Sequence, residues 1–146
     1  MTLQTELQTD PLNRGYAQFF SGQLPVIVSM MNDRSYTMVK TKFVTARTVL
    51  AEHGEAGATV LDKLDAAKTS DPAVKWAMAF VTSDPGIDVG HPTTRSMLDS
   101  LAAANVLTST EASLLKDMAI QPASRAEVLG LPFVTITDVV GAVSNG

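Results

Sequence analysis

The stretch from residue 71 to residue 107 constrains the fold more than any other part of the chain. Four of its apolar residues recur at i, i+3, i+4 and i+7, the spacing of one helical face. They are Val74, Ala77, Met78 and Val81. Trp76 and Phe80, four residues apart, are expected to widen this stripe. Beyond a Pro- and Gly-rich elbow, Met97, Leu98 and Leu101 predict a second helix, so the stretch is expected to form the centre of a small helical core.

Helix-start signals recur elsewhere in the sequence. Asp71 precedes Pro72, a pairing typical of a helix N-cap followed by its first residue. Capping boxes are indicated at Thr108-x-x-Glu111, Ser124-x-x-Glu127 and Thr135-x-x-Asp138. His53 and Gly54 indicate the end of a helix that begins near Lys42. The sequence therefore predicts an all-α fold, a single small domain of about six to eight short helices.

The first forty-two residues give weaker signals. Pro11 ends a short helix over residues 2–9, and a single turn is expected from Tyr16 to Phe20. Residues 23–32 have the composition of a strand, but Pro25 suits the first turn of a helix, and we favour the helix. We therefore predict an N-terminal arm over residues 1–42, with partner docking as one of its possible roles, and a helical domain over residues 43–146.

The net charge of −4 is unevenly distributed along the sequence. Residues 11–50 hold five basic residues and one acidic residue, whereas twelve acidic and six basic residues follow from residue 51 onward. Such polarity could steer assembly with a complementary subunit, although charge runs also form ordinary solvated faces. The pI near 5.0 and the small number of basic residues argue against a nucleic-acid partner. The longest apolar run, LPVIVSMM, is too short to cross a membrane, and we expect no membrane partner.

Few residues suggest catalysis or metal binding. The chain has no cysteine, no G-x-S-x-G nucleophile elbow and no phosphate-binding glycine motif. Asp84, Asp88 and His91 could ligate a divalent metal, but their spacing matches neither an EF-hand loop nor a zinc signature, and turn formation explains them better. We expect no catalytic residue, no cofactor, no metal and no enzymatic activity.

Several segments resemble a family of small proteins of tailed bacteriophages, most of them uncharacterised, that are encoded among virion structural or tail genes. They include TDPLNRGY at 9–16 and the run from residue 60 to residue 101, followed by residues 106–143. The most specific parts are the DPL-x-RGY opening and the SRAE-x-LGL-x-x-VT-x-x-DV ending. Outside residues 17–42, the resemblance covers the chain well. Within residues 17–42, the resemblance implies a more polar helix than the one this sequence has.

This resemblance implies a non-enzymatic virion protein, made in the bacterial host cytoplasm and located in the particle. The favoured role is a minor structural or adaptor subunit of the tail, baseplate or fibre-attachment region. Its partners would be other virion proteins and copies of itself. A head-decoration protein and a non-structural assembly chaperone or accessory protein are the alternatives.

The apolar arm and the basic segment beside it are the candidate interface. The residues concerned are Tyr16, Phe19, Phe20, Val26, Ile27, Met30, Met31, Arg34, Lys40 and Lys42. Apolar side chains left on a surface often mark a binding site, so these residues could dock on a neighbouring subunit. Alternatively, the arm completes the core of its own chain, because apolar runs are usually buried.

Overall fold

A computed structural model describes residues 2–145 and divides them into two compact units. Unit 1 combines the residues up to Met38 with those from Pro122 onward, and unit 2 is the continuous stretch Val39–Gln121. This division differs from the predicted arm over 1–42 and helical domain over 43–146. The last helix of the chain packs with the N-terminal helices, so the N-terminal segment belongs to a folded unit with its own core.

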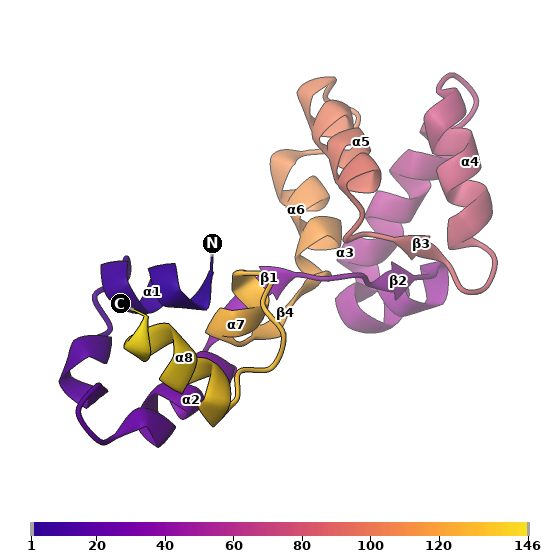
Figure 1. The fold of residues 1–146 in the computed structure, drawn as a ribbon. Coiled ribbons are helices and arrows are strands. Elements are labelled where there is room, and N and C mark those ends of the chain that lie inside the picture. Colours follow the sequence, from indigo (N-terminus) through magenta and orange to yellow (C-terminus); the bar gives the residue numbers. More distant parts are fainter. Residues whose placement is uncertain (1, 146) are drawn as a thin grey trace. The chain divides into compact units, whose positions relative to one another are not determined.

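Over residues 2–38 and 122–145, unit 1 contains five short helical segments. They are α1 (Leu3–Thr9), the 3₁₀ turn η1 (Tyr16–Phe19), α2 (Leu24–Asn32), α7 (Arg125–Val128) and α8 (Ile136–Ser144). Figure 1 labels the four α-helices among them. The one-turn helix after residue 15 and the helix over residues 23–32 are thus confirmed. The capping box at Thr135 and Asp138 begins α8, as predicted. Val134 before this cap and Val139 after it are both buried, which gives the arrangement of a hydrophobic staple.

Unit 2 contains four helices and a small sheet. Its elements are β2 (Phe43–Val44), α3 (Ala46–Ala67), α4 (Pro72–Val81), β3 (Ile87–Asp88), α5 (Pro92–Ala103) and α6 (Ser109–Asp117). Asp71 caps α4 and Thr108 caps α6, both as predicted. The cap of α5 is His91, because its Nδ1 accepts the Thr93 N–H at 3.1 Å. Gly54 has a φ of 55° and kinks α3 at the point where the sequence indicates that a helix ends.

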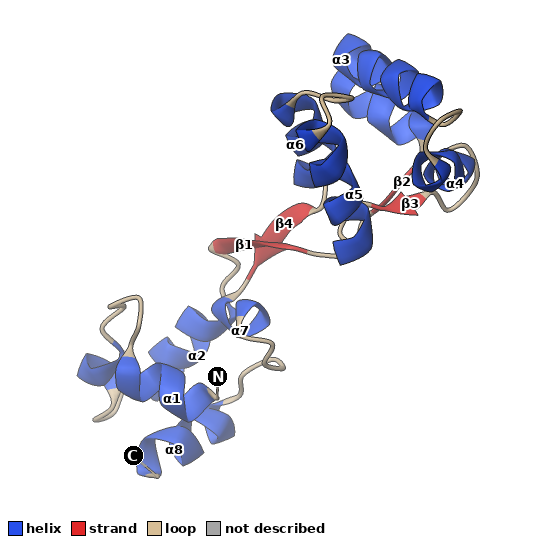
Figure 2. Cartoon of the chain, turned by 90° about the horizontal axis from the view of Figure 1, so that it is seen from above, coloured by secondary structure: helices blue, strands red, loops and turns tan. Residues whose placement is uncertain are grey.

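The fold is mainly helical. It is not the all-α fold that the sequence predicts, because it also contains two short sheets. β2 and β3 pair antiparallel, with Phe43 opposite Asp88 and Val44 opposite Ile87. The second sheet pairs β1 (Tyr36–Val39) with β4 (Ile120–Ala123) (Figure 2). These strands have four residues or fewer, so alternation in the sequence gives little warning of them.

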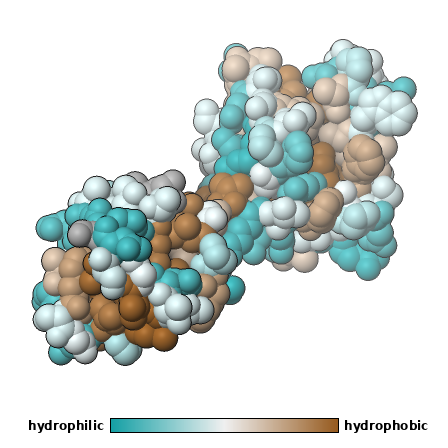
Figure 3. Space-filling model, viewed as in Figure 1, coloured by the Kyte–Doolittle hydropathy of each residue, from teal (hydrophilic) through white to brown (hydrophobic). Residues whose placement is uncertain are grey.

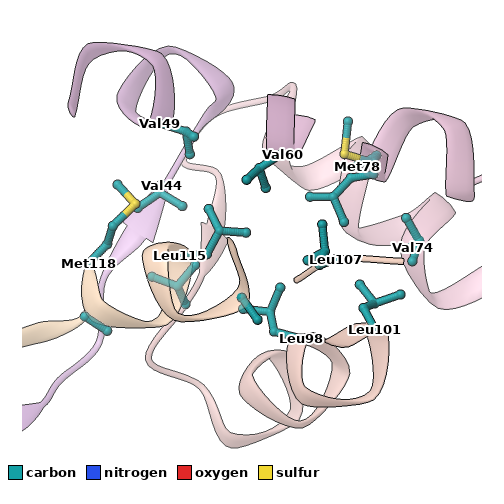
Figure 4. Packing of buried hydrophobic residues seen from close by; sticks show 14 residues of the cluster. Val44, Val49, Val60, Val74, Met78, Leu98, Leu101, Leu107, Leu115 and Met118 are labelled. Carbon is teal, nitrogen blue, oxygen red and sulfur yellow. The ribbon is translucent and has the colours of Figure 1, made fainter. Parts of the chain in front are cut away.

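The core of unit 2 forms where its helices meet the small sheet. Val60 of α3, Val74 of α4, Leu98 of α5 and Leu115 of α6 are buried in one cluster (Figure 4). The predicted stripe on α4 is confirmed at its centre, because Val74, Met78 and Val81 are buried. The expectation for Trp76 and Phe80 is wrong, since these side chains are 63% and 56% exposed. They lie on the face of α4 that points away from the core.

Gly90 provides a stability test, because a methyl group at this position would collide with the backbone carbonyl oxygen of Lys40. We expect Gly90→Ala to lower the free energy of unfolding by about 1–3 kcal/mol, the usual cost of overpacking. Gly141 in α8 is the control, because a Cβ there meets no atom within 4 Å. Gly141→Ala should stabilise by about 0.5–1 kcal/mol. Urea unfolding followed by circular dichroism measures both, and equal effects would contradict the steric argument.

Candidate functional site

A buried cluster of charged and polar side chains lies within unit 1. The Glu6 side chain in α1 is completely buried, and Arg125 in α7 is 9% exposed. Arg125 donates from Nε to Glu6 Oε1 at 2.7 Å and from Nη2 to Oε2 at 3.0 Å, which is a bidentate pair. The hydroxyl of Tyr16, also fully buried, donates to Glu6 Oε1 at 3.0 Å. The carboxylate therefore has both of its oxygens engaged by side chains of its own unit.

Arg14 lies beside this cluster. Its Nη1 donates to the Met30 carbonyl oxygen at 2.8 Å and to the Tyr16 hydroxyl at 3.2 Å. Its guanidinium carbon is 5.6 Å from the ring centre of Tyr16 and 5.2 Å from that of Tyr36, distances at which a cation is attracted to an aromatic face. Arg14 therefore links η1 to the end of α2 and to β1.

The cluster lowers the pKa of Glu6 and raises the pKa values of Tyr16 and Arg125. Burial raises the pKa of the Glu6 carboxyl, but the hydrogen bonds from Arg125 and Tyr16 outweigh burial and leave that pKa below its ordinary value of 4.5. Burial, with the Glu6 carboxylate beside it, raises the pKa of Tyr16 to about 12. Glu6 is thus held ionised and Tyr16 neutral at neutral pH. A buried carboxylate with a lowered pKa and occupied oxygens is suited to a structural role and is a poor general base.

DPL-x-RGY supplies Arg14 and Tyr16 of this cluster and SRAE supplies Arg125, whereas Glu6 comes from α1. In DPL-x-RGY, the Asp10 carboxylate accepts the backbone N–H groups of Arg14 at 2.6 Å and Gly15 at 2.7 Å, which shapes the turn before Tyr16. In SRAE, Ser124 caps α7 by accepting the Glu127 N–H at 3.1 Å, and Arg125 reaches Glu6. Sequence reasoning missed the pair of Glu6 and Arg125. Leu3, Glu6 and Leu7 share one helical face, so the spacing contained a signal that Glu6 is buried.

The elbow between α4 and α5 uses its polar groups to hold the backbone. Oδ1 of Asp88 accepts the N–H groups of Lys42 and Gly90, each at 2.9 Å. His91 caps α5, and the peptide bond between Asp84 and Pro85 is cis. Within residues 2–145, no three His, Asp or Glu side chains gather in a way that could hold a metal ion. His53 is half-buried before the α3 kink, and its Nε2 has no hydrogen-bond partner in the described part of the chain.

The structure separates the candidate interface residues into three groups. Tyr16, Ile27 and Met31 are fully buried in the core of unit 1, so they cannot meet a partner, and their place on the surface is corrected. Phe19, Phe20 and Met30 are half-buried and pack against the same core. The other four residues are at least partly accessible to solvent. Val26 and Arg34 are exposed, and Lys40 and Lys42 are half-buried. The apolar N-terminal segment therefore packs into the core of its own chain, which is the alternative to docking on a neighbouring subunit.

Other apolar side chains stand out from the surface instead. In unit 1, Phe133 is 74% exposed, and Ile136 and Val140 on α8 are each 45% exposed. In unit 2, Trp76 and Phe80 are exposed one helical turn apart, and Phe43 is exposed on β2. Figure 3 shows hydrophobic residues at the surface of both units. Large exposed apolar side chains at neighbouring positions are typical of binding surfaces.

Comparisons of this chain with protein-family models, with curated proteins and with solved structures found no match. Among residues 2–145, no helix combines the length and the apolar character needed to cross a bilayer.

We expect Arg125→Met to lower the free energy of unfolding by about 3–5 kcal/mol, because it leaves the Glu6 carboxylate buried without its main partner. The matched control is Lys68→Met, which removes an ion pair with Asp65 whose two side chains are 44% and 59% exposed. The control should cost less than about 1 kcal/mol. Urea unfolding measures both variants, and similar losses would show that burial of the Glu6 pair matters little.

Tyr16 makes the stability of the chain sensitive to alkaline pH. Its pKa rises from 10.0 to about 12 on folding, so its contribution is complete below pH 10 and is lost as the pH rises towards 12. We expect the free energy of unfolding to fall over this interval more steeply for the natural chain than for Tyr16→Phe. Tyr36 is present in both proteins and serves as an internal control. Parallel slopes for the two proteins would contradict the burial of the Tyr16 hydroxyl.

Proposed function

We propose that this chain is a non-enzymatic virion protein of a tailed bacteriophage, acting as a minor structural or adaptor subunit. The tail, baseplate or fibre-attachment region is the proposed location. The support from sequence is the resemblance of the DPL-x-RGY and SRAE-x-LGL segments to proteins encoded among virion genes. In the fold, these segments provide the turn at Asp10 and the ion pair of Arg125 with Glu6.

The observation that carries the proposal is the distribution of side chains between interior and surface. The groups most able to perform chemistry, including Glu6, Asp88 and His91, make hydrogen bonds that maintain the fold. The groups most able to bind another protein, Trp76, Phe80 and Phe133 among them, are exposed. Aromatic residues are enriched at protein interfaces and supply much of their binding energy. This distribution suits a subunit that works by contact.

The test is quantitative mass spectrometry of purified particles of the phage that encodes the chain. We expect a low copy number relative to the major head and tail proteins, in an integral ratio set by the symmetry of a vertex, neck or tail tip. A copy number similar to that of the major capsid or tail-tube protein would favour the head-decoration alternative or a place along the tube. Absence from the particle would contradict the proposal and favour the assembly chaperone or accessory protein.

A further inference from the structure

One side of α4 in unit 2 presents an aromatic surface with a positive charge at its edge. We name Lys75, Trp76, Ala79 and Phe80 the α4 surface. Trp76 and Phe80 are 63% and 56% exposed, and Ala79 beside them is also exposed. Because positions i and i+4 lie above one another on a helix, the two rings form one continuous apolar strip. The opposite side of α4, through Val74, Met78 and Val81, is buried in the core of unit 2.

A hollow of about 300 Å³ lies alongside this strip. It is lined by Asp65 and Lys68 from α3 and by Lys75, Met78, Ala79 and Thr82 from α4 or its end. α3 and α4 pack against each other within unit 2 (Figure 1), so one unit supplies the whole hollow. Its lining combines the apolar side chains of Met78 and Ala79 with the charged side chains of Asp65, Lys68 and Lys75. An apolar side chain of a partner could therefore enter it while the partner lies along the rings.

The charges at the edge of this surface decide which partner fits. Lys75 is the only charged residue of α4. Its Nζ lies 5.5 Å from the ring centre of Trp76, and no carboxylate among residues 2–145 forms an ion pair with it. Lys68 is already paired with Asp65 at 2.6 Å. The edge therefore has an excess of positive charge, which a partner carboxylate would complement.

We infer that the α4 surface is the docking site for an acidic amphipathic helix of a partner protein. The apolar face of that helix would cover Trp76 and Phe80 and place a side chain in the hollow, and its carboxylates would pair with Lys75. A second copy of this chain is a poorer complement, because its α4 would bring another Lys75, and the Asp65 carboxylate at its hollow is already paired with Lys68. The inference rests on the proposed function, because it names the chemistry of one contact that such a subunit would make.

Trp76 is the only tryptophan of the chain, so its fluorescence reports directly on this surface. The experiment titrates the full chain with a synthetic helix that has leucine on one face and glutamate elsewhere. We expect the emission of Trp76 to shift to shorter wavelength as the helix covers the ring, and the affinity to fall as salt is added. A matched peptide with lysine in place of every glutamate should bind at least about tenfold more weakly, because like charges would then meet at the edge.

Two variants and one control locate the binding. Phe80→Ser should weaken binding of the acidic peptide by about fivefold or more, the loss typical of an aromatic residue that anchors an interface. Lys75→Glu should weaken it by about tenfold or more and improve binding of the lysine peptide. Phe43→Ser removes a phenylalanine of similar exposure, 50%, from β2 and should leave the affinity unchanged. All three positions are exposed, and an unchanged urea midpoint confirms that each variant is folded.

The outcomes separate this inference from the proposed function. No shift with the acidic peptide, or equal affinity for both peptides, would overturn the acidic partner. A blue shift that grows with the concentration of the chain alone would show that a second copy covers the surface, and this too would overturn the inference. Selective binding of the acidic peptide supports it even where mass spectrometry finds no copy in the particle, a result that would refute only the virion location.

Discussion

The fold of unit 1 depends on one ion pair between residues that are 119 positions apart, Glu6 and Arg125. Burying two charges is unfavourable unless their mutual attraction and further hydrogen bonds compensate for the lost water. Here the compensation comes from the bidentate geometry and from the hydroxyl of Tyr16. Because Arg125 lies near the end of the chain, α1 gains its partner only after all of unit 2 has been synthesised. Unit 2, a continuous stretch from Val39 to Gln121, has no such requirement within its own core.

The features that local sequence could predict are those that depend on near neighbours in the chain. The caps at Asp71, Thr108 and Thr135 use a side chain and a backbone group within three residues of each other, so the sequence contains the whole interaction. The kink at Gly54 is local for the same reason. The two sheets were missed because their strands have only two or four residues and pair with strands that are distant in sequence, so their formation depends on packing that no local pattern encodes.

The candidate interface shows a different limit of sequence reasoning. The apolar composition of residues 16–31 predicts that other side chains cover this segment, but it does not identify those side chains. In the structure, Val134, Val139 and Ala142 from the far end of the chain cover Ile27 and Met31. Trp76 and Phe80 present the converse case. Helical periodicity assigns residues to faces, and the buried face of α4 is complete with Val74, Met78 and Val81, so the aromatic pair is left on the other side.

These two corrections change where a partner is to be sought. The N-terminal segment satisfies its own apolar surface within unit 1, and its basic neighbour Arg34 lies 3.5 Å from Glu127. Inside unit 2, the α4 surface is neither covered by apolar side chains nor neutralised by a carboxylate. Its two rings are exposed, and the charged group of Lys75 lies over the Trp76 ring. Exposed aromatic rings are poorly hydrated, so covering them with a partner is favourable. The positive charge of Lys75 beside them favours a partner with negative charge. Unit 1 thus uses the buried charges of Glu6 and Arg125 to close its own fold, whereas unit 2 leaves Trp76 and Phe80 of α4 on its surface.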